Sequence, residues 1–190
     1  LMLFGELVDK SWLRVSDSGR FDLHELIRQF IDWQRRVTIN RANQTETQQL
    51  ETDLAGRHSR YYGAFLQSQE PFLYGPRQHE VLDELLAEVD NIRQGWRWAV
   101  EHLQVESIGR YLTSWQWLGE VRCWHREMAD IFDKTADSLN AQLQHIGSVA
   151  DIPLQLTLAR TLYCQARHLL YGLAAPVDVE RVCQESMRYW

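Results

Sequence analysis

The segment "SWLRVSDSGRFDLHELIRQF" (residues 11–30) changes its hydrophobic periodicity half-way along. Leu13 and Val15 alternate with polar residues, and Phe21 and Leu23 repeat the alternation after a polar stretch. A period of two with one apolar face is typical of a β-strand. Residues 16–19 (Ser-Asp-Ser-Gly) favour a turn between the two runs. The segment therefore begins with a predicted β-hairpin.

A helix is predicted directly after the hairpin. Asp22 and Glu25 have the D-x-x-E spacing of a capping box, in which both side chains accept hydrogen bonds from backbone N–H groups at the helix start. Apolar residues then recur at helical spacing to about Val37, namely Leu26, Ile27, Phe30 and Trp33. Residues 1–9 carry the pattern of a helix end. Helix, hairpin and helix are the parts of the second half of a winged-helix domain, which we place at residues 1–40.

The remaining residues, 41–190, are predicted to be helical throughout. The clearest apolar stripe runs from Val81 to Leu103 as one helix, and Gly95 inside it suggests close packing against a neighbouring helix. Further helices are expected at about Thr45–Gln69, Glu106–Gly119, Val121–Leu143 and Pro153–Leu173 and from Asp178, with breaks at residues 147–148 and 175–176. The pattern favours an α-solenoid of tetratricopeptide-like (TPR-like) helical hairpins. The predicted fold class is mainly α, with one β-hairpin.

Charge and composition exclude several classes of protein. The net charge is −6 and the pI is about 5.6, which argues against clustered phosphate contacts, so we expect no direct contact with nucleic acid. The longest apolar run is too short for a bilayer span, so we expect no membrane contact. Three widely spaced cysteines fit a reducing compartment, and we expect a cytoplasmic protein.

Motifs for catalysis and metal binding are weak. No phosphate-binding loop of the form G-x-x-x-x-G-K-[ST] occurs, and no nucleophile with its base can be recognised, so the chain is not predicted to be an enzyme. Cys123-x-His125 and Cys164-x-x-x-His168 have usable ligand spacings, but neither has a partner pair. We interpret the helical cysteines as small core residues, with the histidines at a polar edge, and predict no metal site.

Two other clusters favour structural interpretations. Acidic side chains on the helix near residue 85 are expected on a solvated face rather than in acid–base catalysis: Asp83, Glu84, Glu88 and Asp90. Tryptophans in the helical region are expected to pack between helices rather than to stack on bases: Trp96, Trp98, Trp115, Trp117 and Trp124.

His24 stands at the first turn of the predicted helix after the hairpin. Free backbone N–H groups and the positive end of the helix dipole make this a place where an anion binds readily. By position alone, a structural or solvated histidine is the more frequent case.

"LVDKSWLRV" (7–15) and "GRFDLHELIRQF" (19–30) together resemble the end of the winged-helix domain in STAND-class signalling ATPases of the NB-ARC type. Leu23-His24-Glu25 resembles their MHD motif, with Leu for Met and Glu for Asp. Residues 57–100, which include "RHSRYY", "VDNIR" and "WRWAV", resemble the helical segment that follows in bacterial LuxR-type and SARP-type transcriptional regulators. The tail from Leu162 resembles a degenerate tetratricopeptide unit.

The resemblance implies a nucleotide switch. In that class, a nucleotide-binding domain holds ADP or ATP, and the motif histidine contacts the β-phosphate of ADP in a closed, inactive state. Carried over, His24 is the ADP contact, and the nucleotide-binding domain lies upstream in the same protein. No cofactor is then expected for the isolated chain.

The helical region is then the start of a sensor that binds a protein or small-molecule inducer and permits oligomerisation on activation. Both ends of the sequence suggest a piece of a longer protein. The alternative is a stand-alone helical-repeat scaffold for protein interaction, in which His24 has no nucleotide role.

Overall fold

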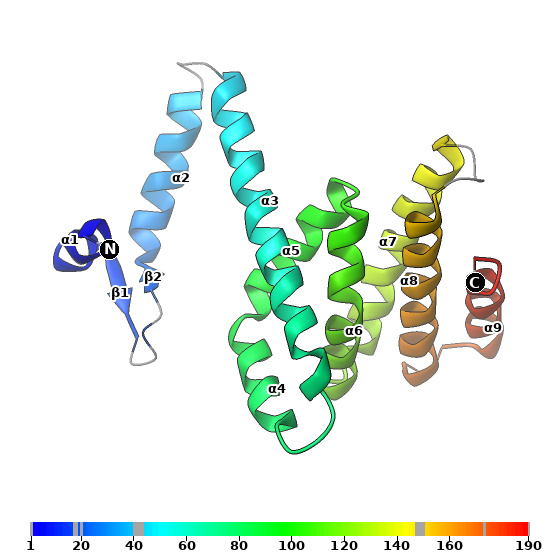
Figure 1. The fold of residues 1–190 in the computed structure, drawn as a ribbon. Helices are drawn as coiled ribbons and strands as arrows, with labels where there is room; N and C mark the ends of the chain where they lie inside the picture. The colour runs from blue at the N-terminus through cyan, green and yellow to red at the C-terminus, as the bar shows by residue number, and fades with distance from the viewer. Residues whose placement is uncertain are drawn as a thin grey trace. The chain divides into compact units, whose positions relative to one another are not determined.

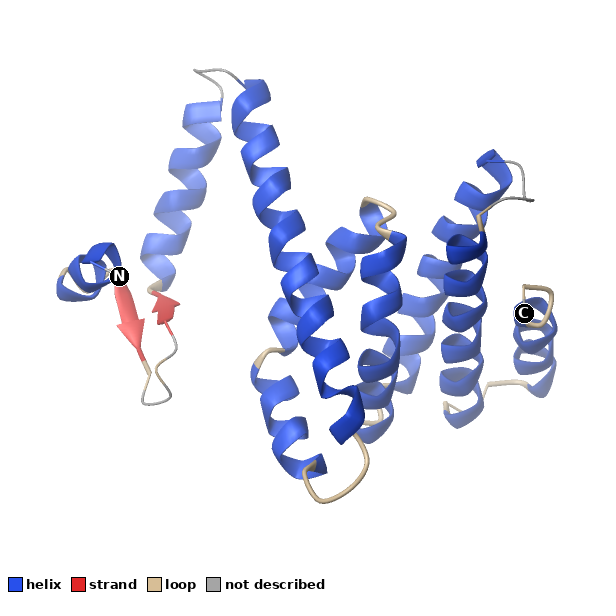
Figure 2. Cartoon of the chain, in the orientation of Figure 1, coloured by secondary structure: helices blue, strands red, loops and turns tan. Residues whose placement is uncertain are grey.

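The computed structural model describes residues 2–16, 19, 21–39, 44–146, 151–172 and 174–189. Figures 1 and 2 show a mainly helical chain with a single two-stranded hairpin in the described part, which confirms the coarse fold class. The chain divides into two compact units, Leu1–Thr52 and Asp53–Trp190, here called the hairpin unit and the helical unit. The winged-helix and TPR-like arrangements remain predictions.

The hairpin unit contains α1 (Met2–Asp9), β1 (Leu13–Val15), β2 (Phe21–Leu23), α2 (Glu25–Ile39) and the start of α3 (Gln44–Gln69). The two strands are antiparallel, with Leu13 opposite Leu23 and Val15 opposite Phe21, as the alternating pattern requires. Gly19 has a φ of 75°, a conformation that glycine adopts at no steric cost. Residues 17 and 18 of the predicted turn lie outside the described residues, as does residue 20.

The helical unit continues with η1 (Glu70–Phe72), α4 (Gln78–Ala87), α5 (Val89–Glu101), α6 (Val105–Val121), α7 (His125–Ile146), α8 (Ile152–Tyr171) and α9 (Pro176–Ser186). The single helix predicted from Val81 to Leu103 is wrong, because Glu88 separates α4 from α5. The Glu88 carboxylate accepts hydrogen bonds from the Tyr62 hydroxyl and the Asn91 amide, both at 2.8 Å. The predicted break at residues 147–148 lies outside the described residues.

Packing in the helical unit centres on α6 and α8. Figure 1 shows α6, α7, α8 and α9 side by side, and α8 contacts all three of the others. The core is continuous and aromatic-rich, and its largest fully buried side chains are Trp115, Tyr111 and Phe132. Three of the five tryptophans assigned to helix packing, at 96, 115 and 117, are buried, and the other two are partly exposed. A core of this kind is what holds α3 to α9 together, since most of the stability of helices in proteins comes from tertiary packing of an apolar face.

Gly95 confirms the expected close approach of helices. A Cβ at this position would collide with the Tyr111 hydroxyl and would press on the Ser59 backbone. The Ser59 hydroxyl donates to the Gly95 carbonyl at 2.8 Å, and the Tyr111 hydroxyl donates to the Ser59 carbonyl at 2.9 Å. These two buried hydrogen bonds tie α3, α5 and α6 together where only glycine leaves room.

Three helices end at residues other than glycine with positive φ: Ser11 (58°), Leu103 (48°) and Cys123 (57°). After each of them the next residue donates its backbone N–H to a helix carbonyl five residues back, as Trp12 does to Leu7 and Trp124 to Gly119. This is the geometry of a left-handed C-terminal cap. It turns α5 into α6 and α6 into α7 within a few residues.

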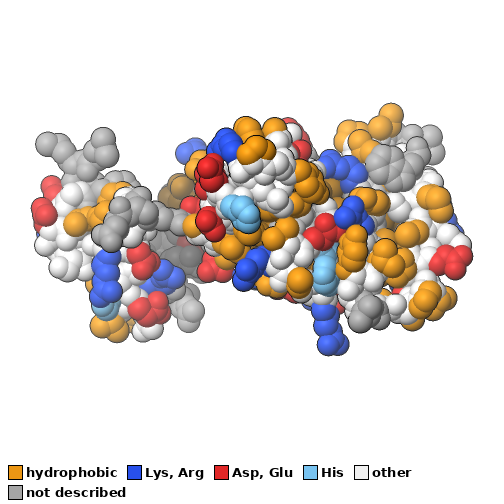
Figure 3. All heavy atoms as spheres, turned by 90° about the horizontal axis from the view of Figure 1, so that it is seen from below, with side chains coloured by type: hydrophobic (Ala, Val, Ile, Leu, Met, Phe, Trp, Pro, Cys, Tyr) orange, Lys and Arg blue, Asp and Glu red, His pale blue; other side chains and the backbone are white. Residues whose placement is uncertain are grey.

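Acidic side chains predicted on a solvated face are exposed at Asp83, Glu84 and Asp90, whereas Glu88 is half-buried. On the face of the helical unit shown in Figure 3, basic side chains are scattered among acidic and hydrophobic ones. Among the described residues, no helix is long and apolar enough to cross a bilayer.

Candidate anion-binding site at His24

His24 joins β2 to α2 and acts as the N-cap of α2. Its backbone carbonyl accepts hydrogen bonds from the N–H groups of Ile27 (2.9 Å) and Arg28 (3.0 Å), which starts the helix. Its Nδ1 accepts a hydrogen bond from the Leu26 N–H at 3.2 Å. In the neutral ring, the other nitrogen then carries the proton, so Nε2–H is the donor that remains for a ligand.

The predicted capping box is wrong. Asp22 lies in β2 and pairs with Arg28 at 3.4 Å, and it caps no backbone N–H group. The Glu25 carboxylate accepts from the Gln29 side chain at 3.0 Å instead of reaching back. Because Asp22 is held in the strand register, the imidazole of His24 supplies the cap. His24 thus has a structural role as the N-cap of α2, whether or not it also binds an anion.

The surface beside His24 is concave and carries positive charge. Its volume is about 610 Å³, and it lies wholly within the hairpin unit. Its lining contains Lys10, Arg14 and His24, with Val8, Ser11, Trp12, Leu13, Leu26 and Ile27, and none of these described residues is acidic. In a chain with a net charge of −6, two cations and an imidazole without a carboxylate form a locally attractive surface for anions.

This donor set fits a phosphate group. Arginine and lysine side chains and a ring N–H donate hydrogen bonds, which is what phosphate oxygens accept. Lys10 and Arg14 are exposed, so their attraction for an anion is screened by salt. The lining contains no carboxylate among the described residues.

Of the two Cys and His pairs considered as metal ligands, the structure brings the two histidines together. The Nδ1 atoms of His125 and His168 lie 3.3 Å apart, at the start of α7 and near the end of α8. Cys164 is buried as predicted, but Cys123 is exposed. In the described part of the chain, no three His, Cys, Asp or Glu side chains are grouped as metal ligands.

His168 contradicts the predicted polar edge, because its side chain is fully buried. Burial and, to a smaller extent, like-charge repulsion by His125 lower its pKa to about 4. The Gln116 carbonyl opposes the shift but makes no hydrogen bond to Nε2, which has no partner. His168 is therefore a neutral core residue at neutral pH. The sequence could not show this, because the burial depends on packing between α6, α7 and α8.

Sequence reasoning found His24 but not Lys10 or Arg14. A signal for them was present in the predicted hairpin: Arg14 lies opposite Asp22, two residues before His24, and Lys10 directly follows α1. Searches among known proteins found no family model, no curated protein and no solved structure that matches this chain.

Proposed function

We propose that this chain is the regulatory and sensing part of a STAND-class nucleotide switch, in which His24 contacts the β-phosphate of ADP. The nucleotide would be held by a nucleotide-binding domain of the same protein. The observation that supports the proposal most is the concave surface whose lining includes His24, Lys10 and Arg14 and no acidic residue.

The energetics suit a switch. A hydrogen bond from a ring N–H to a charged phosphate contributes about 1.5–3 kcal/mol. A coupling of about 1–3 kcal/mol changes an equilibrium by about 5–150-fold, which is enough to bias a closed state over an open one. Loss of one contact would therefore loosen the closed state without abolishing nucleotide binding by the rest of the protein.

His24 has two roles that variants can separate. His24→Ala removes both the helix cap and the Nε2–H donor. His24→Ser keeps a side-chain acceptor that caps well but removes the ring donor. His79→Ser is the matched control, since His79 is an exposed histidine on α4.

The test uses the protein with its nucleotide-binding domain and measures the ADP released on denaturation of the purified protein. We expect His24→Ala and His24→Ser to lose ADP about equally, by roughly tenfold, and His79→Ser to retain it. Full ADP retention in both His24 variants would contradict the proposal. ADP loss in His24→Ala alone would also contradict it, because the cap rather than the phosphate contact would then matter.

The 190-residue chain alone should bind ADP more weakly than about 1 mM, because one hydrogen bond and two screened charges fall short of the roughly 4 kcal/mol that this affinity needs. A titration followed by the ring signals of His24 measures this. Tighter binding would contradict the assignment of the main nucleotide site to another domain.

A further inference from the structure

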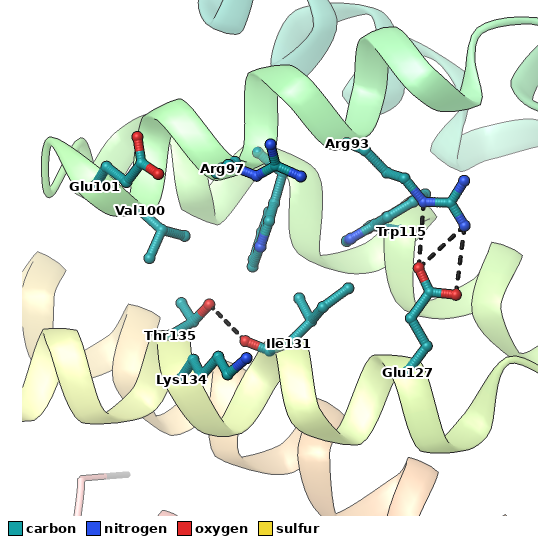
Figure 4. A pocket seen from close by; sticks show the side chains of 10 residues that line it. Arg93, Arg97, Val100, Glu101, Trp115, Glu127, Ile131, Lys134 and Thr135 are labelled. Atoms are coloured by element: carbon teal, nitrogen blue, oxygen red, sulfur yellow. Dashed lines mark hydrogen bonds and ion pairs between the residues drawn. The ribbon is translucent and has the colours of Figure 1, made fainter.

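A second concave site lies in the helical unit, between α5 and α7, with α6 behind it (Figure 4). Its volume is about 360 Å³, near the lower limit for small-molecule sites. The residues that line it are Arg93, Trp96, Arg97, Val100 and Glu101 from α5, Trp115 from α6, and Glu127, Ile131, Lys134 and Thr135 from α7.

Trp115 forms part of the lining, and its indole N–H has no hydrogen-bond partner. The side chain is fully buried, and Nε1 is inaccessible to solvent in the structure. An indole nitrogen can only donate, and a buried donor without an acceptor costs about 1–3 kcal/mol. Figure 4 shows the ring extending into the space between α5 and α7. The site therefore contains a donor that an incoming acceptor would satisfy.

In the structure the neighbouring polar groups do not serve as that acceptor, and the contacts of Thr135 and Glu127 are to other residues. The Thr135 hydroxyl donates to the Ile131 carbonyl at 2.8 Å. Glu127 accepts from Arg93 at 3.0 Å, and Asp90 lies 3.6 Å from the same guanidinium. In the structure, none of these groups accepts the Trp115 N–H, which leaves this donor open to an acceptor that enters the site.

Two cations of the site lack a partner. Arg97 and Lys134 lie on opposite walls, on α5 and α7, and both are exposed (Figure 4). Neither forms an ion pair with any residue that the structure describes, whereas Arg93 is paired. Glu101 lines the α5 end, so the site has three cations and two carboxylates, in a chain that is acidic as a whole.

We propose that this site binds a small organic carboxylate with an aromatic or aliphatic body. The carboxylate accepts the Trp115 N–H, and Arg97 and Lys134 balance its charge. The body packs on the apolar part of the lining, which Trp96, Val100 and Ile131 provide. The inference depends only on contacts within the helical unit, so it holds whether or not His24 contacts ADP.

The experiment follows the indole N–H signals of the full 190-residue chain, labelled with ¹⁵N, during titration with sodium phenylacetate. The chain has eight tryptophans, and Trp115→Phe identifies the signal of interest. A compound of this size should bind with a Kd of about 1 mM. We expect a saturable shift of the Trp115 signal, and at least roughly fivefold weaker binding of phenylacetamide, which has the same ring without the charge.

Variants of exposed residues test the charges without disturbing the core. Arg97→Gln and Lys134→Gln should each weaken binding by about threefold to fivefold, and Lys134→Glu by at least about tenfold. Arg126→Gln is the matched control, because Arg126 is exposed on α7 and does not line the site. Sodium chloride at the same concentrations controls for ionic strength. If Trp115→Phe does not fold, the Trp115 N–H signal is identified as the indole signal that shifts in Lys134→Glu. Lys134 is exposed, so this variant should fold.

Saturable binding that depends on Trp115, Arg97 and Lys134 supports the proposal. No shift of the Trp115 signal up to about 10 mM phenylacetate would overturn it. Phenylacetamide binding as tightly as phenylacetate would overturn it too, because the site would then not recognise a carboxylate. The same holds if Arg97→Gln and Lys134→Gln leave the affinity for phenylacetate unchanged. None of these outcomes involves ADP, so they are distinct from a failure of the nucleotide switch.

Discussion

The hairpin unit and the helical unit are stabilised in different ways. Among the described side chains of the hairpin unit none is buried, and Phe21, Leu26, Phe30 and Trp33 are all more than half exposed. The helical unit has a continuous core from Leu66 to Val182. Local backbone hydrogen bonds, caps and strand register therefore define the hairpin unit, and close packing defines the helical unit. A short two-stranded hairpin is marginal by itself, so substitutions should have much smaller effects there.

Phe132→Ala should have the largest effect. Phe132 is fully buried, and its ring lies 5.8 Å from that of Trp96 and 5.7 Å from that of His168. Removing it should lower the free energy of unfolding by about 3–5 kcal/mol in urea denaturation. Phe30→Ala is the control in the hairpin unit, where the ring is 54% exposed, and its effect should stay within about 0.5 kcal/mol. Similar losses of unfolding free energy in Phe132→Ala and Phe30→Ala would contradict the difference in packing between the two units.

Acid should destabilise the helical unit through His168. Its pKa is lowered from 6.5 to about 4 in the folded chain, so the unfolded chain binds more protons between these values. The stabilisation is complete above about pH 6.5 and is lost as the pH falls toward 4, by up to about 3 kcal/mol. Unfolding measured at several pH values should show this slope, and His168→Gln should flatten it. An unchanged slope in His168→Gln would assign the acid sensitivity to other groups.

Gly95→Ala should destabilise the chain by about 1–3 kcal/mol, because the added methyl group collides with the Tyr111 hydroxyl. Gly5→Ala in α1 is the matched control, since a Cβ there meets nothing within 4 Å. It should be neutral or stabilise by up to about 1 kcal/mol through helix propensity. Thermal unfolding of the two variants measures the difference. A stable Gly95→Ala variant would mean that α3, α5 and α6 are less closely packed than described.

The smallest effect is expected at the start of α2. His24→Ala should cost about 1 kcal/mol of local helix stability, and His24→Ser close to zero, because serine restores the acceptor for the Leu26 N–H. Hydrogen exchange of the first-turn amides of α2 measures this difference. Equal exchange in both variants would show that the ring nitrogen of His24 does not cap the helix.

Sequence periodicity predicted the hairpin, α2 and most of the helices, because each has a hydrophobic pattern that is local in the chain. It missed the break at Glu88, since the apolar stripe continues through it, and the contact of Glu88 with Tyr62, 26 residues away, is not visible in a local pattern. Capping by His24 was missed because Asp22 matches the capping-box pattern. Only the pairing of Asp22 with Arg14 in the hairpin shows that Asp22 belongs to the strand and not to the helix start.

The two candidate sites were predictable to different degrees. His24 was identified because its role is tied to a local motif. Trp115, Arg97 and Lys134 come from three different helices, and the sequence gives no sign that they line one site. The missing partner of the Trp115 N–H depends on every neighbour in the folded core. Such a feature is visible only when the packing is known.

The left-handed backbone at Ser11, Leu103 and Cys123 lowers the stability of the chain. A left-handed conformation costs about 1–2 kcal/mol at a residue that carries a Cβ, and glycine avoids most of that cost. These turns reverse the chain after α1, between α5 and α6, and between α6 and α7. At Cys123, which is exposed, glycine would relieve this cost without loss of packing, whereas Leu103 also packs against the core. Leu103 and Cys123 lie away from both candidate sites, whereas Ser11 lines the surface beside His24, so an engineered version of this scaffold would begin with the corner at Cys123.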